Sequence, residues 1–201
     1  MATFIMLPGG VTGTNEWYQP STTNACLHPN VDNDNDDTDY CREYTNGHEI
    51  TFTIADPSVS ESAISSITSV QIVLKARYTN PNPSQTVNLQ ISQGGTNIAN
   101  GIDTLAIVSG ASYTQYTGTA RTVSKVLGSV AWSYTNLEDL QLKLETTSAA
   151  ASRTEVRVSY LYALVTYVEA GYGNDVMGVD SGDIAKIMGI ATADISKVNG
   201  I

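Results

Sequence analysis

Basic residues are scarce in this chain. Lysine and arginine together number 10 against 20 aspartate and glutamate residues, which gives a net charge of −10 at pH 7. Nucleic acids and anionic membrane surfaces are bound through basic surfaces, so neither is an expected partner. Much of the negative charge is concentrated between Cys26 and Glu49, where seven carboxylates face the single Arg42.

Long apolar runs are also missing. No segment is long enough to span a bilayer, so membrane insertion is not expected. The N-terminal apolar run ends at Leu7 and lacks a basic start, so it does not fit a secretion signal. We therefore expect either a mature chain or release by another route, such as lysis from a virus particle.

Residues with distinctive catalytic chemistry are few. His28 and His48 are the only histidines, and neither has a serine or cysteine at the spacing of a known catalytic motif. The two glycine pairs, at 9–10 and 94–95, fit turns better than a phosphate-binding loop. Paired carboxylates of a glycosidase remain an alternative within the acidic stretch, but no acid there is marked for burial. The sequence predicts a protein that is not an enzyme.

The segment Arg153–Glu169 is the longest strand-like run in the sequence. Valine and tyrosine are frequent in it, and it contains neither glycine nor proline. Alternate residues from Val156 to Leu164 are apolar, and beyond Tyr160 the intervening positions also become apolar. This pattern predicts a central strand that is buried on one face at its start and on both faces later.

Shorter alternating segments precede this strand. They are His48–Ala55, Val70–Thr79, Thr86–Ser92, one or more between 96 and 128, and Leu140–Glu145. Turn residues separate them, and a single helical turn near Tyr134–Asp139 is expected to be capped by Thr135 or Asn136. We predict an all-β fold, an antiparallel β-sandwich of about seven or eight strands with jelly-roll or Greek-key connections. The sandwich is expected at 17–170, between an N-terminal arm (1–16) and a tail (171–201).

The two cysteines, Cys26 and Cys41, flank the acidic loop. A disulfide between them would close a loop of about 16 residues and stabilise the fold by roughly 3 kcal/mol. The alternative is two reduced, buried thiols. Neither histidine lies at a zinc-finger spacing from them, so a zinc site is not expected.

Carboxylates alternate along the acidic loop. Alternating oxygen ligands suit Ca²⁺, but position 6 of an EF-hand counted from Asp32 holds Asp37 instead of glycine. A calcium site of another type and a solvated loop whose aspartates cap local turns are both open. The candidate calcium ligands are Asp32, Asp34, Asp36, Asp37 and Asp39.

The N-terminal arm is too short to fold by itself. It can pair with the sheet of its own domain or add a strand to a neighbouring copy. Its candidate assembly residues are Phe4, Ile5, Met6 and Leu7.

The tail contains an 11-residue repeat, VMGVDSGDIAK, IMGIATADISK and VNGI, in which Gly178, Gly189 and Gly200 align. Each unit predicts a short helix with Ser181 or Thr192 as N-cap and glycine after its end. Such short helices need a surface to cover, on this sandwich or on a neighbouring subunit. The candidate assembly residues here are Ile184, Ile187, Ile190, Ile195, Val198 and Ile201.

Several stretches resemble a known group of proteins. An early Trp17, DDTDY (Asp36–Tyr40), EITFTI, VQIVLKAR and VRVSYLYALVTY are similar to β-sandwich proteins of tailed phages and environmental bacteria. The tail resembles the I-x-K-V-N-G-V repeats at the end of phage virion proteins. This resemblance implies a decoration or fibre subunit on a particle surface and supplies no catalytic residues. Cys41, where an aliphatic residue would be expected after DDTDY, departs from the pattern and favours the disulfide.

These observations lead to one main functional prediction and two alternatives. The main one is a structural subunit, virion or extracellular, that self-assembles through its terminal segments with itself or with other subunits. The second is a glycan-binding β-sandwich module, stabilised by calcium if the acidic loop binds it. A bacterial surface-layer or adhesive protein is the third.

Overall fold

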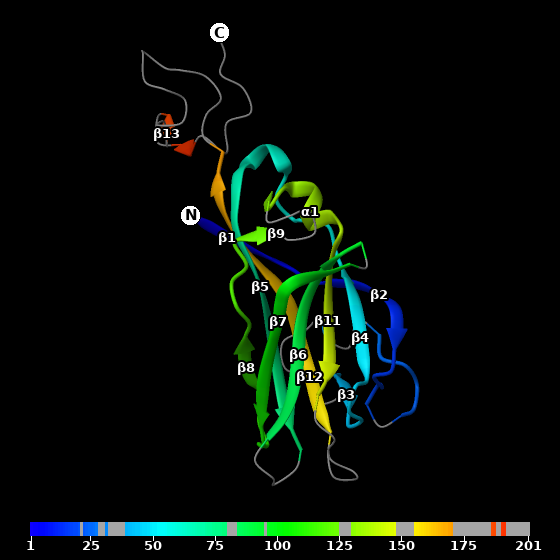
Figure 1. Ribbon diagram of the computed structural model, residues 1–201. Coiled ribbons are helices and arrows are strands. Elements are labelled where there is room, and N and C mark those ends of the chain that lie inside the picture. The colour runs from blue at the N-terminus through cyan, green and yellow to red at the C-terminus, as the bar shows by residue number, and fades with distance from the viewer. Residues whose placement is uncertain are drawn as a thin grey trace.

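The computed structural model describes residues 1–20, 22–27, 31, 39–79, 84–94, 96–124, 130–147, 155–170, 186–187 and 190–191. Most of these residues belong to two antiparallel sheets that form a β-sandwich (Figure 1). The predicted fold class is therefore confirmed. Within the described residues, no helix combines the length and the apolar character that a membrane span requires.

The first sheet, here called the β12 sheet, is built around the strand that the sequence marks as central. β12 (Val156–Glu169) pairs with β1 (Ala2–Met6) on one side and β5 (Ile64–Tyr78) on the other. β3 (Cys41–Glu43) also pairs with β12, and β8 (Thr114–Thr117) completes the sheet beside β5. β5 begins at Ile64 rather than at the predicted Val70, so part of the expected polar connection is strand.

The second sheet, here called the β11 sheet, has the order β2-β4-β11-β6-β7. Its strands are β2 (Pro8–Asn15), β4 (Glu49–Ile54), β11 (Leu140–Thr146), β6 (Ser84–Gln93) and β7 (Thr96–Val108). β4, β6 and β11 match the predicted segments closely. Their inward side chains, including Phe52, Leu89 and Leu142, are completely buried and pack against the β12 sheet.

The N-terminal segment is divided between the two sheets. β1 forms an edge of the β12 sheet and β2 forms an edge of the β11 sheet, with Leu7 between them. A Cβ atom at Gly9 would lie 3.2 Å from the backbone nitrogen of Ala55, so the missing side chain allows β2 to approach β4 closely. The segment expected to be a separate arm pairs with strands of its own domain.

β12 changes its inward parity at Ser159. Val156 and Val158 are buried, and a register shift with β5 between Val158 and Tyr160 then inserts an extra residue. Leu161 and the alternate residues that follow it become the buried ones, whereas Tyr160 is half-buried on the outer face. This β-bulge explains why both parities look apolar in the sequence.

The smaller elements lie between these strands. They are the 3₁₀ turn η2 (Glu61–Ala63), the pair β9 (Val123–Ser124) and β10 (Val130–Ala131), and the helix α1 (Tyr134–Glu138). The N-cap of α1 is Ser133, whereas the sequence predicted Thr135 or Asn136. Ser133 and Asn136 form a capping box, because each side chain accepts a hydrogen bond from the other residue's backbone N–H.

The described part of the tail is short. β13 (Lys186–Ile187) and β14 (Ile190–Ala191) form an antiparallel pair. The sequence predicts the end of a short helix at this point. Two β-branched isoleucines and a helix too short to propagate by itself favour the extended pair. The remaining residues of the repeat, including Ile184, Ile195, Val198 and Ile201, lie outside the described residues.

Candidate functional site

The outer face of the β11 sheet is polar across its central strands. In β11, Leu140, Leu142 and Leu144 point into the core, so the alternate residues Gln141, Lys143 and Glu145 point outward. β4 and β6 follow the same rule, with Ile and Leu inward and hydroxyl, amide or carboxylate side chains outward. The face therefore presents hydrogen-bonding groups on neighbouring strands.

Strand register aligns these groups into rows. Gln141 lies opposite Thr53 of β4 on one side and Ser92 of β6 on the other. The Oγ of Ser92 and the Oε1 of Gln141 are 3.3 Å apart, within hydrogen-bond distance. This row brings together side chains from three separated parts of the sequence.

A second row crosses the sheet at Lys143. Thr51 and Gln90 lie directly opposite this lysine, and its ammonium group forms an ion pair with Glu49. The Gln90 side chain is more than nine-tenths buried, and its Oε1 has no hydrogen-bond partner among the described residues.

A third row runs through Glu145. Glu49 and Asn88 are its direct neighbours, and the Nδ2 of Asn88 donates to the Oε2 of Glu145 at 3.4 Å. The Oγ1 of Thr104 on β7 donates in turn to the Oδ1 of Asn88 at 2.7 Å. These contacts hold the outward side chains in place before any ligand arrives.

β2 is the edge strand beside β4, and three of its residues line a groove on this sheet. A register shift between Thr12 and Asn15 displaces β2 from regular pairing with β4, and Gly13 there has a φ of 65°, which glycine adopts without strain. The groove has a volume of about 430 Å³. Its lining comprises Thr12, Gly13, Thr14, Glu49, Thr51, Ser92, Gly94, Gln141 and Lys143.

The groove offers hydroxyl, amide, carboxylate and ammonium groups. Pockets for drug-like molecules and cofactors are lined mainly by apolar side chains, and this lining contains none. Its chemistry suits a ligand that carries many hydroxyl groups. In the described part of the chain, no three histidine, cysteine, aspartate or glutamate residues are grouped to hold a metal ion.

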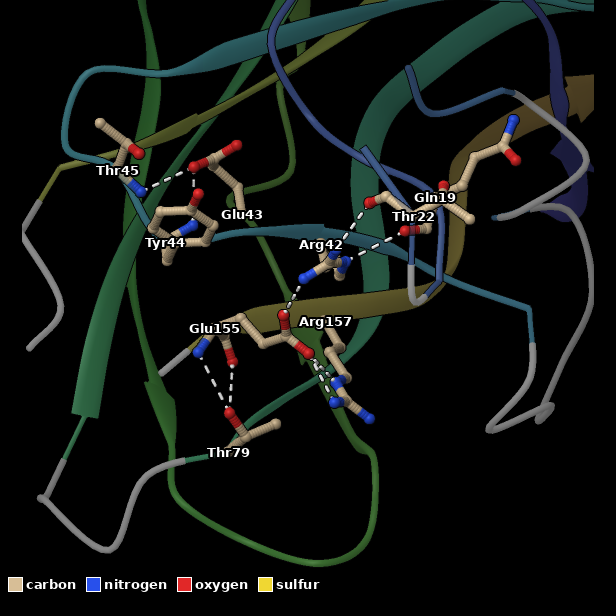
Figure 2. Close-up of polar contacts among 9 residues, drawn as sticks. All are labelled: Gln19, Thr22, Arg42, Glu43, Tyr44, Thr45, Thr79, Glu155 and Arg157. Atoms are coloured by element: carbon tan, nitrogen blue, oxygen red, sulfur yellow. Dashed lines mark hydrogen bonds and ion pairs between the residues drawn. The ribbon is translucent and has the colours of Figure 1, made fainter. Parts of the chain in front are cut away.

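A second polar cluster, around Arg42 and Glu155, lies at the β3 end of β12 (Figure 2). Three nitrogens of Arg42 each donate to the protein, to the carbonyls of Gln19 and Thr22 and to the Oε2 of Glu155. The Oε1 of Glu155 accepts a hydrogen bond of 2.6 Å from the Nε of Arg157. Because Nε, Nη1 and Nη2 of Arg42 all donate to protein acceptors, this cluster anchors Gln19 and Thr22 to β12.

Buried Glu43 and half-buried His48 lie close together beside that cluster. Glu43 is completely buried, and its Oε1 accepts hydrogen bonds from the backbone N–H groups of Tyr44 and Thr45 (Figure 2). The Nδ1 of His48 is 3.3 Å from the same oxygen, within ion-pair range, although the geometry is not that of a hydrogen bond. The backbone carbonyl of His48 also accepts from the indole of Trp17, so this histidine is packed into the structure.

The predicted disulfide is present between Cys26 and Cys41, whose Cα atoms are 5.5 Å apart. Val31, inside the loop that it closes, is completely buried and accepts a hydrogen bond from the N–H of Leu161 on β12. Both contacts fix the base of the acidic loop on the β12 sheet.

Of the five predicted calcium ligands, Asp39 alone lies within the described residues. Asp39 is half-buried next to Tyr40. Asp32, Asp34, Asp36 and Asp37 lie outside the described residues, so calcium binding by this loop stays a prediction.

The N-terminal assembly residues fall on β1 and at its end. Phe4 and Met6 point into the core, and the ring of Phe4 packs edge-on against Tyr167 with ring centroids 5.5 Å apart. Ile5 is on the outer face and is 44% exposed.

Sequence reasoning missed the groove. Outward orientation of Thr51, Thr53, Gln141 and Lys143 follows from alternation, but alternation does not show which strands are neighbours. The sequence does contain one signal for this site, because β4, β6 and β11 each carry polar residues at alternate positions.

No protein-family model and no curated protein matches this sequence. Among solved structures, the CBM36-1 domain of a multidomain xylanase from the hindgut metagenome of Trinervitermes trinervoides has 13% identity and a TM-score of 0.42, over 83% of this chain and 98% of that one. The C-terminal CBM6 of LamC, a marine laminarinase from Zobellia galactanivorans, has 11% identity and a TM-score of 0.43, over 82% and 99%.

A carbohydrate-binding module CBM36 in complex with calcium and xylotriose has 13% identity and a TM-score of 0.40, over 84% of this chain and 100% of that one. Identities this low concern the fold and not the ligand. The comparisons do not test the resemblance of the tail repeat to phage virion proteins.

The main functional prediction, a self-assembling virion or fibre subunit, is wrong. The structural neighbours named above are carbohydrate-binding modules and not virion or fibre subunits. The physical reason lies partly in β1, one of the two segments through which assembly was expected. Its residues from Ala2 to Met6 pair with β12 of the same chain.

Proposed function

We propose that this chain is a non-enzymatic glycan-binding module that holds a polysaccharide in the groove on the outer face of the β11 sheet. The observation that carries the proposal is the groove lining, in which hydroxyl, amide and charged side chains from β2, β4, β6 and β11 converge. Sugar hydroxyl groups both donate and accept hydrogen bonds, and this lining supplies partners of both kinds.

The arrangement is pre-organised in the free protein. Gln141 is within hydrogen-bond distance of Ser92, and Lys143 is paired with Glu49, so few rotamers remain to be fixed when a ligand binds. Pre-ordered side chains lower the entropic cost of association.

An extracellular location fits this function. The Cys26–Cys41 disulfide supports an oxidising compartment, which is where such bonds persist. The proposal includes calcium bound by the acidic loop, which would stabilise the module.

Affinity electrophoresis in gels containing a panel of soluble polysaccharides tests the proposal. We expect at least one polysaccharide to retard the wild-type chain and Gln141→Ala to weaken that binding by roughly 2- to 10-fold, as loss of one or two hydrogen bonds predicts. The matched control is Gln115→Ala, since Gln115 is an exposed glutamine on β8 at the outer face of the other sheet. Binding that both variants retain fully would place the ligand elsewhere and overturn the proposed site.

A further inference from the structure

Among the described residues, none that lines the groove is aromatic. Sugars that stack on proteins use the faces of tyrosine or tryptophan rings, and the outward tyrosines Tyr160 and Tyr162 belong to the other sheet. Both tryptophans are buried, with Trp17 completely enclosed and Trp132 4% exposed. Recognition in the groove must therefore come from hydrogen bonds.

The charges of the groove neutralise each other. Lys143 and Glu49 are its only charged lining residues, and they form an ion pair. The next charge along the face is Glu145, and the chain as a whole carries −10. A polyanion would meet a neutral groove on a negatively charged protein, whereas an uncharged ligand meets no electrostatic penalty.

The ammonium group of Lys143 also occupies the position where a cation would bind. Glu49 is the only carboxylate in the lining, and its partner is already positively charged. Ca²⁺ requires six to eight oxygen ligands, several of them carboxylates. A calcium ion in the groove would have to displace this lysine and would find only one carboxylate.

Resting on the proposed function, we infer that the ligand of the groove is a neutral, hydroxyl-rich polysaccharide recognised by hydrogen bonds alone, with neither a bridging cation nor ring stacking. The geometry favours such a polysaccharide because the two charged side chains of the lining are paired and its other polar side chains are uncharged. Salt and chelators should then leave binding unchanged, since screening acts on charged partners.

The test is affinity electrophoresis with neutral polysaccharides (arabinoxylan, mannan and mixed-linkage β-glucan) and with two polyanions (polygalacturonate and alginate), with and without EDTA. We expect a neutral polymer to retard the chain, Gln141→Ala to reduce that retardation and EDTA or added salt to change it less than twofold. The polyanions should not retard it.

Outcomes separate the two proposals. Binding of a polyanion that Gln141→Ala weakens would overturn this inference and leave glycan binding intact. Groove-dependent binding that EDTA abolishes while the chain stays folded, as judged by its circular dichroism, would do the same. No retardation by any polymer, or retardation that Gln141→Ala leaves unchanged, would overturn the proposed function itself. Gln115→Ala controls for general effects of removing an exposed amide.

Discussion

The guanidinium group of Arg42 donates a hydrogen bond to the Oε2 of Glu155 across 2.7 Å, which joins residues 113 positions apart. Their side chains are 19% and 11% exposed, so the pair is largely shielded from water. Arg157 lies directly opposite Arg42 in the sheet and binds the other oxygen of the same carboxylate. One glutamate therefore bridges two adjacent arginines, one through each carboxylate oxygen.

Replacing Glu155 by glutamine should destabilise the fold. Two neighbouring guanidinium groups would then lack their shared counter-charge, and like charges directly opposite each other in a sheet repel. We expect a loss of about 1–3 kcal/mol in the free energy of unfolding, measured by urea denaturation, with partial recovery in high salt. Exposed Glu138 is the control, because Glu138→Gln should stay within about 0.5 kcal/mol of wild type. If E155Q were as stable as wild type, the charge of Glu155 would make no net contribution to the free energy of unfolding.

Gly118 should not accept a side chain. A Cβ atom there would lie 2.7 Å from the Oδ2 of Asp103, which accepts a hydrogen bond from the N–H of Thr119. The other oxygen of Asp103 binds the Thr119 hydroxyl and the Arg121 guanidinium, so movement of this carboxylate disturbs three contacts.

We therefore expect Gly118→Ala to lower the free energy of unfolding by about 1–3 kcal/mol, as overpacking typically does. Gly110→Ala is the matched control, since the nearest atom to its Cβ would be 3.6 Å away. Thermal and urea denaturation of both variants compare the two sites directly. An equal loss of unfolding free energy in both variants would contradict the close approach of Asp103 to Gly118.

Tyr134 should make stability depend on pH in the alkaline range. Partial burial raises the pKa of Tyr134 above its usual 10.0, and the carboxylates of Glu138, Asp56 and Glu61 raise it further. The folded state thus holds the phenolic proton to higher pH than the unfolded state. Its contribution to stability is complete below pH 10 and is lost as pH rises through the folded pKa.

The comparison is with Tyr134→Phe. This variant loses the 3.1 Å hydrogen bond from the tyrosine hydroxyl to the carbonyl of Val59, so it should be about 0.5–1.5 kcal/mol less stable at neutral pH. Above pH 10 the difference in unfolding free energy between this variant and wild type should become smaller. Urea denaturation at several pH values measures that difference. A difference that stays constant to pH 11 would show that Tyr134 titrates normally.

The sequence predicted the sandwich because its strands alternate clearly. β4, β6 and β11 show one apolar parity each, and the turn residues between them are unambiguous. β12 was identified as central, but burial on both faces was predicted beyond Tyr160, whereas one face is buried and the other half-buried there. A β-bulge at Ser159 changes the inward parity and leaves no distinctive residue behind. The same limit applies to the α1 cap, where Ser133, Thr135 and Asn136 are all competent and tertiary packing decides.

The candidate site was harder to predict. Its residues come from four strands, and one of them, Gly13, lies where β2 leaves regular pairing with β4. Pairing order in an antiparallel sheet depends on long-range contacts that single-strand periodicity does not encode. The disulfide, in contrast, could be predicted from two cysteines that flank one irregular loop.

The division of the N-terminal segment between the two sheets has a consequence for folding. β1 pairs with β12, so Ala2 lies opposite Tyr167, and β2 pairs with β4. Pairings between residues so distant in sequence form slowly, because a long loop must close before they contribute. During synthesis, β1 would stay unpaired until β12 has emerged, so this edge of the β12 sheet would be completed only after β2 to β11 have been made.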